Sequence, residues 1–547
     1  MRTVNFLFLI GFFLSSCHTE EGQLAQWVAY DETEELQANQ EHPVKRMRYK
    51  RIQSQHSDRN TFFIPFKEAL LQFTESEYER LKPLILEQDM LRIQEHVQKG
   101  NLTYEQLTLF YLYRIYRFET ARDTYLNAII ALNPEVLEQA RKRDQNRAQE
   151  LSHPLYGMPI LLKDNINALP MATTAGAAAF KDNIPSDDAF LVKCLKAKGA
   201  LILGKVNLSE WAYYFCQGCP LGYSAMGGQT LNPYGRKTFE SGGSSSGSGV
   251  AVAANYAVAA IGSETSGSIL SPSGKNSVVG LKPTIGAVSR SGVVPISSTL
   301  DTAGPMTKNV VDNAILMNAL VGEDPTDSYS FKSKPIFYQG LDTVSLKGKR
   351  LGIFTAFEKD SLMKLSLKKM KAAGAEIISF DPPEIELQNF RRLLDVDMRS
   401  DLPKYIKNHA AQDLPFDSVQ DVVAFNKKDT LLHAPYGQGI FLRIAQETLS
   451  QEEFKSEKER LMQQAKIYFQ AFEALDLDAV ISIDNSTASY AAAAHYPALG
   501  VPMGYLSNGQ PKNLTFIVPS KHEQLLLELG AAFERLTQAR KLPELFQ

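Results

Sequence analysis

The chain has 547 residues, 44% of them hydrophobic and 22% charged, a balance that is ordinary for a globular protein. This length is ample for a buried core and leaves room for one large domain with insertions. The formal net charge of −3 supplies no basic field of the kind that nucleic-acid binding needs. We therefore expect a folded protein without a nucleic-acid partner.

The first 17 residues are typical of an export signal. Arg2 precedes an apolar run over residues 6–14, which is too short to span a bilayer and fits the core of a signal peptide. The sequence LSSC at residues 14–17 resembles a bacterial lipobox, which implies cleavage before Cys17 and lipidation of its thiol. An ordinary signal peptide with an incidental cysteine is the alternative. We expect residues 1–16 to be a lipoprotein signal peptide and the mature protein to be lipid-anchored in the bacterial cell envelope, on the periplasmic or surface side of a membrane.

Residues 17–99 are predicted to form a polar tether followed by helices. The first part is charged and irregular, whereas residues 67–100 have the periodicity of amphipathic helices, with Pro83 as an interruption. The basic run at residues 45–51 is interpreted as a solvated linker, with contact to anionic lipid as the alternative. Apolar residues at helical spacing over residues 102–118 predict a helix that is buried on one face.

Residues 241–283 are rich in glycine and serine, yet their pattern is not that of a flexible linker. Ten of the chain's 34 glycines fall between residues 242 and 292. They cluster on either side of the small apolar run VAVAANYAVAAI, which predicts a buried helix or strand. Glycine-rich turns at the ends of a buried element let backbone N–H groups approach a bound group closely. We therefore interpret the stretch as a functional site.

The serines of this stretch permit two kinds of nucleophile. GSSSG at residues 243–247 matches the nucleophile elbow of an α/β-hydrolase-type esterase, centred on Ser245, but the residues before it do not predict the strand that an elbow needs. Such an enzyme would also need a histidine base from farther along the chain: His409, His433, His495 or His522. The alternative is a serine activated by a lysine of lowered pKa. Lys163 follows the apolar run at residues 158–162, which would carry it into the core.

Four motifs, GMPILLKDNI, GGSSSGSG, GSETSGSI and VVGLKPT, occur in an order that resembles the amidase signature family. The resemblance runs from about residue 100 to the C-terminus, so residues 100–547 are expected to be the catalytic domain. It implies an α/β fold in which a mixed, twisted β-sheet is covered by helices on both faces. It also implies an amide hydrolase with a Ser-Ser-Lys triad that needs no cofactor and no metal.

The resemblance assigns roles to individual residues. Lys163 matches the catalytic lysine, and Ser244 matches the bridging serine, which family members hold in a cis peptide conformation. Ser268 matches the nucleophile that forms the acyl-enzyme. The backbone N–H groups that match the oxyanion hole are those of Thr265, Ser266, Gly267 and Ser268.

Two positions depart from the family pattern. Leu270 stands where most members carry an arginine, and an aliphatic residue there resembles the bacterial peptide amidase-like subgroup. Ser266 stands where that subgroup commonly has aspartate. Without the arginine we expect peptide amides to be better substrates than glutamine or asparagine with a free α-carboxylate. The substrate is expected to be a small-molecule or peptide amide, and the particular amide and the oligomeric state stay open.

A catalytically silent surface binding lipoprotein is the remaining alternative. The presence of Lys163, Ser244 and Ser268 in their motifs argues against it.

Three cysteines follow Cys17. Cys194 is expected to be a buried residue of a helix. Cys216 and Cys219 form a C-x-x-C that lacks the second pair of a zinc ribbon, so a small-loop disulfide and a pair of free thiols are equally open.

The last third of the chain predicts a β-α-β unit over residues 349–380, followed by a mainly helical stretch from 382 to 470. Residues 479–484 predict a buried strand, and residues 497–519 resemble the family's C-terminal strand pair. Ser520 and Glu523 are predicted to form a capping box that opens the last helix.

Overall fold

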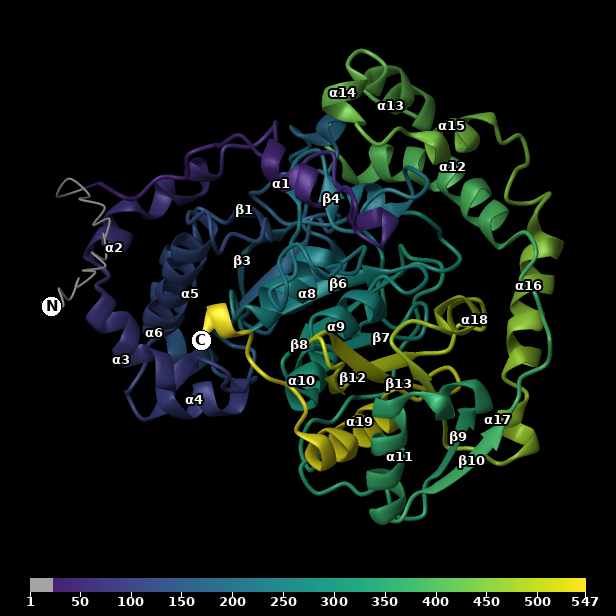
Figure 1. The fold of residues 1–547 in the computed structure, drawn as a ribbon. Helices are drawn as coiled ribbons and strands as arrows, with labels where there is room; N and C mark the ends of the chain where they lie inside the picture. Colours follow the sequence, from purple (N-terminus) through teal and green to yellow (C-terminus); the bar gives the residue numbers. More distant parts are fainter. Residues whose placement is uncertain (1–22) are drawn as a thin grey trace, which may run out of the picture.

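Residues 23–547 are described in a computed structural model, so the predicted signal peptide and Cys17 lie outside the described residues. The centre of the molecule is an 11-stranded sheet in the order β1-β3-β2-β6-β8-β7-β12-β13-β11-β9-β10 (Figure 1). Its strands are β1 (Ile129–Leu132), β2 (Pro159–Lys163), β3 (Leu201–Val206), β6 (Ala259–Glu264), β7 (Val279–Lys282), β8 (Thr302–Thr307), β9 (Arg350–Phe354), β10 (Glu376–Phe380), β11 (Ala479–Ile483), β12 (Ala498–Tyr505) and β13 (Pro511–Ile517). A separate hairpin pairs β4 (Tyr223–Ser224) with β5 (Gly228–Gln229).

The sheet mixes parallel and antiparallel pairs, as predicted. β2 runs parallel to β3 and β6, and β9 runs parallel to β10 and β11, whereas pairs such as β6 with β8 and β12 with β13 are antiparallel. β2 and β6 are buried along their whole length, as expected of central strands covered on both faces. Ile160 lies opposite Ala259, so Lys163 and Ser263 emerge at the same edge of the sheet.

The helices are α1 (Thr33–Ala38), α2 (Lys67–Gln72), α3 (Glu75–Ile85), α4 (Met90–Gln98), α5 (Tyr104–Glu119), α6 (Val136–Glu150), α7 (Phe190–Ala197), α8 (Ser246–Ala253), α9 (Leu270–Lys275), α10 (Val310–Leu320), α11 (Ser361–Ala372), α12 (Phe390–His409), α13 (Val419–Asn426), α14 (Thr430–His433), α15 (Gly439–Gln446), α16 (Lys455–Tyr468), α17 (Ala471–Ala474), α18 (Ala488–Ala493) and α19 (Glu523–Thr537). Within the described residues, every helix is too short or too polar to cross a membrane.

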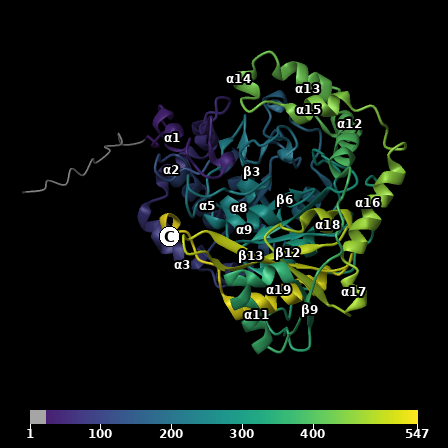
Figure 2. The same cartoon turned by 45° about the vertical axis from the view of Figure 1, so that its right-hand side comes forward.

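Alternating residues of β12 show that helices cover both faces of the sheet. Leu499 and Val501 lie next to Gly530 of α19, where a methyl group added to the glycine would clash with Leu499. The neighbouring Ala498 packs instead in an apolar cluster with Leu270 of α9. Because side chains alternate across a strand, α9 and α19 lie on opposite faces. α8 packs beside α9, and α11 packs beside α19 (Figure 2). α10 also packs against α19.

The apolar run of the glycine-rich stretch divides into a helix and a strand. α8 ends at Ala253, and Asn255 then takes a left-handed backbone conformation with φ of 54°. β6 begins four residues later, at Ala259. The prediction of a buried element is therefore confirmed, and the two sequence alternatives are both present.

The segment interpreted as a tether is packed against the rest of the protein. Met47, Tyr49 and Ile52 are at most 2% exposed and belong to the main hydrophobic core. Ile52 also accepts a hydrogen bond from the backbone N–H of Gln229 at 2.8 Å. The basic run is thus not a solvated linker, because apolar side chains between its charges anchor it. The chain from residue 23 can be followed in purple along one side of the molecule in Figure 1.

Helices α12 to α15 build a second hydrophobic core. Leu402 of α12 and Phe441 of α15 pack there with Trp211 and Phe215 from the segment after β3. Figure 1 shows these helices as a green arc over one side of the sheet, continued by α16. The helical content predicted for residues 382–470 is confirmed.

The C-terminal predictions are confirmed except for the cap of the last helix. β9, α11 and β10 form the expected β-α-β unit, and β12 pairs with β13. The predicted capping box is wrong, because Ser520 Oγ donates to the carbonyl of His495 at 2.9 Å. The Glu523 carboxylate accepts from the backbone N–H of Thr284 at 2.9 Å. Both side chains are therefore used in tertiary contacts. Pro83, predicted as an interruption, lies inside α3, which ends two residues later.

Candidate active site

Lys163 ends β2 and points into a fully buried polar cluster. Its Nζ lies 2.7 Å from Ser244 Oγ, 2.9 Å from Ser263 Oγ and 3.0 Å from the Ser263 carbonyl oxygen. Burial lowers the pKa of Lys163 to about 7, against the opposing charges of Asp301 and Glu264. A neutral lysine keeps two N–H bonds for the Ser263 oxygens. Its lone pair is then free to accept the proton of Ser244.

Ser244 is held between Lys163 and the loop that carries Ser268. The Gly243–Ser244 peptide bond is cis, as the resemblance implies, and the Ser244 side chain is fully buried. The backbone N–H of Ser209 donates to the Ser244 carbonyl at 3.0 Å, and that of Ser245 donates to the Ser268 carbonyl at 3.1 Å. Ser268, by contrast, is partly exposed. Of the three residues predicted to act together, only Ser268 is accessible to a substrate from outside.

The loop around Ser268 is fixed by one carboxylate. Glu264, at the end of β6, is 1% exposed and accepts the backbone N–H groups of Gly267, Ile269 and Leu270 at 2.6, 2.7 and 3.0 Å. The Gly267 amide is therefore committed to Glu264 and does not face a substrate, which corrects its prediction as an oxyanion donor. Among residues 23–547, the amides of Thr265, Ser266 and Ser268 have no acceptor, so these three stay the predicted donors.

Ser245 does not have the surroundings of a nucleophile. Its hydroxyl is fully buried, donates to the Ser263 carbonyl at 3.0 Å and accepts the Ser263 N–H at 3.2 Å. Within the described chain no histidine hydrogen-bonds to it, including the four that were considered as its base. The hydrolase elbow centred on Ser245 is therefore not formed.

Asp301 is partly buried next to the site and fixes the loops around it by hydrogen bonds. It accepts the Thr265 hydroxyl at 2.5 Å and the backbone N–H groups of Ile296 and Ser297 at 2.8 Å each. Burial raises the pKa of Asp301 to about 6, so the group is ionised at neutral pH and its charge acts on Lys163. Asp301 and Glu264 were missed by sequence reasoning, although a lone glutamate in a glycine- and serine-rich stretch is a visible signal.

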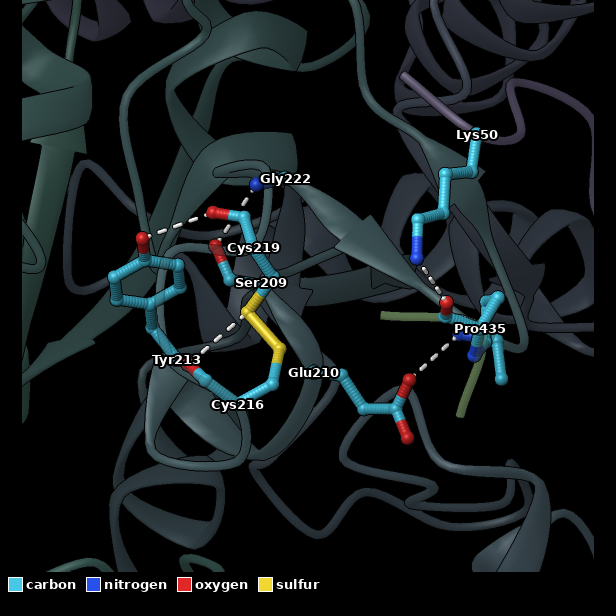
Figure 3. Close-up of a disulfide and its surroundings, with 9 residues drawn as sticks. Lys50, Ser209, Glu210, Tyr213, Cys216, Cys219, Gly222 and Pro435 are labelled. Carbon is cyan, nitrogen blue, oxygen red and sulfur yellow. Dashed lines mark hydrogen bonds between the residues drawn. A yellow bond between two sulfur atoms is a disulfide. The ribbon is translucent and has the colours of Figure 1, made fainter. Parts of the chain in front are cut away.

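Cys216 and Cys219 form a disulfide that lies next to the site (Figure 3). Tyr213 Oη donates to the Cys219 carbonyl at 2.9 Å. The loop is joined to the site by Ser209, whose Oγ accepts the Gly222 N–H at 2.8 Å and whose own N–H binds the Ser244 carbonyl. This settles the alternative between a disulfide and free thiols. Cys194 lies in α7 as expected but is only partly buried.

The nearby Glu210 is also buried, and burial raises the pKa of its carboxyl to about 8. Figure 3 shows it pointing away from the disulfide, where it accepts the backbone N–H of Ala225 at 2.9 Å.

Leu270, the position where the resemblance leads one to expect arginine, does not face an open site. It is 2% exposed and packs with Ala488 and Phe390 in an apolar cluster. Next to this cluster lies a cleft of about 770 Å³ between the start of α12 and α18. Ser489 on its wall hydrogen-bonds through Oγ to Ser266 Oγ at 3.1 Å, so the cleft adjoins the loop of Ser268.

A family model described as Amidase matches residues 107–487. The chain belongs to the amidase signature family. A protein of Arabidopsis thaliana named a probable amidase is 37% identical over 466 residues, 81% of this chain and 88% of that protein.

Solved structures of family members share the fold over most of their length. An amidase family protein from Bacillus anthracis is 34% identical with a TM-score of 0.85, covering 90% of this chain and 99% of that one. The peptide amidase from Stenotrophomonas maltophilia is 37% identical with a TM-score of 0.80, covering 84% and 99%. The chain is therefore an amide-hydrolysing enzyme, which argues against the silent binding protein and the α/β-hydrolase.

Proposed function

We propose that this amidase works through a Ser268–Ser244–Lys163 relay. The observation that carries the proposal is the 2.7 Å contact between Lys163 Nζ and Ser244 Oγ, made by a lysine whose burial lowers its pKa to about 7. General bases are most effective when their pKa lies near the working pH. At neutral pH this lysine has a lone pair for an appreciable fraction of the time.

The proposed reaction moves one proton along the relay in each half-reaction. Ser268 Oγ attacks the amide carbon while its proton passes to Ser244, and the proton of Ser244 passes to neutral Lys163. Free backbone N–H groups of the loop stabilise the oxyanion. The proton then returns through Ser244 to the leaving nitrogen, so that the C–N bond breaks and an acyl-ester of Ser268 remains. Water hydrolyses the ester by the same route and restores Ser268.

Peptide amides are the proposed substrates. Similarity to the Stenotrophomonas maltophilia peptide amidase supports this, and the aliphatic Leu270 resembles the pattern of the peptide amidase-like subgroup.

A serine-directed fluorophosphonate probe followed by peptide mass mapping tests the nucleophile. The label is expected on Ser268 and should be lost in Ser268→Ala. Label on Ser245 would contradict the proposal and support an α/β-hydrolase-type nucleophile at Ser245 instead. Absence of label on any serine, together with absence of amide hydrolysis by the wild type, would also overturn it.

We also propose that the mature protein is held at a membrane of the bacterial cell envelope by lipid on Cys17. The lipobox-like LSSC at residues 14–17 supports this. Expression of the full chain and of Cys17→Ser, with detergent partitioning and mass analysis of the N-terminus, provides the test. Cys17→Ser should appear in the aqueous phase or unprocessed. Equal partitioning of both forms, with no lipid mass on Cys17, would contradict the proposal.

A further inference from the structure

The cleft beside α12 and α18 is placed to hold the part of a substrate that does not react. Its volume of about 770 Å³ is in the range of sites for drug-sized ligands. Through Ser489 it touches Ser266, two residues before Ser268. A substrate whose amide lies at Ser268 and whose chain runs past Ser266 would enter this cleft.

The charges on the cleft wall are not balanced. Arg392 pairs with Glu447 at 2.9 Å, and Arg443 pairs with Asp395 at 2.6 Å. Each of these two guanidinium groups makes two hydrogen bonds to its carboxylate, so both are occupied. Arg391, on the same wall and exposed, has no ion-pair partner within residues 23–547.

The balanced pairs are also fixed in place. Tyr214 Oη donates to Asp395 Oδ1 at 2.7 Å and receives a bond from Arg443 at 3.2 Å. Asp395 is therefore not free to turn towards Arg391. The cleft keeps one uncompensated positive charge, carried by a planar group that matches the two oxygens of a carboxylate.

We propose that Arg391 is a specificity-determining residue that binds a carboxylate on the acyl side of the substrate, so that this enzyme prefers acidic peptide amides. The inference rests on the proposed function, because it takes Ser268 as the point where the amide reacts. The charge that recognises the substrate would then lie on the exposed Arg391 in the cleft, since Leu270 is apolar and buried. It requires a substrate long enough to reach from Ser268 into the cleft.

The test compares two amidated peptides that differ only in aspartate or asparagine before the amidated residue. Wild type should show a higher kcat/KM for the aspartate peptide by roughly five-fold, the upper end for an exposed ion pair. Arg391→Ala should bring this ratio to about one, Arg391→Lys should retain part of it, and added salt should lower it in the wild type. Arg399→Ala, on the same helix but off the cleft wall, is the matched control and should keep the wild-type ratio.

Binding of the same two peptides to Ser268→Ala, with and without Arg391→Ala, separates this inference from the proposed function. If binding of the aspartate peptide depended on Arg391 but the wild type hydrolysed neither peptide, the role of Arg391 would be supported and the proposed amide hydrolysis would be wrong. Turnover of both peptides with a ratio that Arg391→Ala does not change would overturn the cleft assignment alone. Neither binding preference nor turnover would overturn both.

Discussion

Lys163 lies in the site and Arg391 in the neighbouring cleft, and their different burial gives these two basic side chains opposite properties. Lys163 is fully buried, and burial lowers its pKa to about 7, so it can exist as a neutral base. Arg391 lies at an exposed cleft, and a guanidinium stays charged at any pH that a protein tolerates. Burial therefore makes Lys163 a proton acceptor, whereas the exposed Arg391 keeps its charge and can bind an anion.

The two regions also differ in what holds them. Around Lys163 the partners are backbone groups and hydroxyls of β6 and its loops, which leave little freedom of position. Around Arg391 the structure rests on side-chain ion pairs that join α12 to Arg443 of α15 and to Glu447, which follows that helix. Substitutions in the first region should therefore affect the chemical step, and those in the second should affect the choice of substrate.

The largest effect is expected from Lys163→Met, which keeps the volume of the buried chain but removes the base. The kcat/KM for a peptide amide should fall by about 10²–10⁴-fold, the usual contribution of a general base. The melting temperature should also fall, because the buried oxygens of Ser244 and Ser263 lose Lys163 as a hydrogen-bond partner. Steady-state kinetics and a melting curve give the two readings, with Arg399→Ala as the control. A loss of less than ten-fold would remove Lys163 from the relay.

Glu264→Gln should have the next largest effect. The carboxylate accepts three backbone N–H groups, and an amide in its place turns an N–H donor towards at least one of them. A buried donor without a partner costs about 1–3 kcal/mol, so the melting temperature should fall. The kcat/KM should fall by about 10–100-fold, since the predicted oxyanion donors share this loop.

The exposed Glu384 provides the matched control for this change. Glu384→Gln makes the same chemical substitution at the surface and should leave both values unchanged. Wild-type activity in Glu264→Gln would show that the loop holds its shape without the carboxylate.

The pH profile should shift when Asp301 is changed. Because the relay needs neutral Lys163, kcat/KM should rise through a pKa of about 7 and reach a plateau above it. The charge of Asp301 raises the pKa of Lys163. Asp301→Asn removes this charge, so the rising limb should move to lower pH. The exposed Asp413→Asn should leave the limb in place, and a shift to higher pH in Asp301→Asn would reverse the assigned electrostatics.

Sequence alone predicted the parts of this site that lie within short motifs. Lys163 was identified because an apolar strand leads directly into it, and Ser244 and Ser268 because their motifs resemble a known family. Glu264 was missed, although it is the only charged residue between Glu240 and Lys275. Its three hydrogen bonds are to backbone N–H groups, and no pattern of side chains in the sequence predicts such bonds.

Long-range packing was predicted less well, for a related reason. The apolar residues that anchor the N-terminal segment, Met47 and Tyr49 among them, alternate with charged residues and lack a helical period. Their partners lie far away in the sequence, so no local pattern reveals the burial. The position of Arg391 at the cleft likewise depends on how α12 packs, which the helical prediction for residues 382–470 could not supply.

The smallest effect is expected from the disulfide, which lies in the second hydrophobic core and is linked to Ser244 through Ser209. Closing so short a loop contributes up to about 2 kcal/mol to stability in the chain-entropy model. Its link to Ser244 passes through Ser209, which keeps its own hydrogen bonds when the sulfurs separate. Cys216→Ala combined with Cys219→Ala should therefore lower the melting temperature and reduce kcat/KM by only a few-fold. Cys194→Ala, remote from this loop in α7, is the control for loss of a cysteine. If the double variant lost more activity than Glu264→Gln, the disulfide loop would belong with Lys163 in the catalytic region rather than around it.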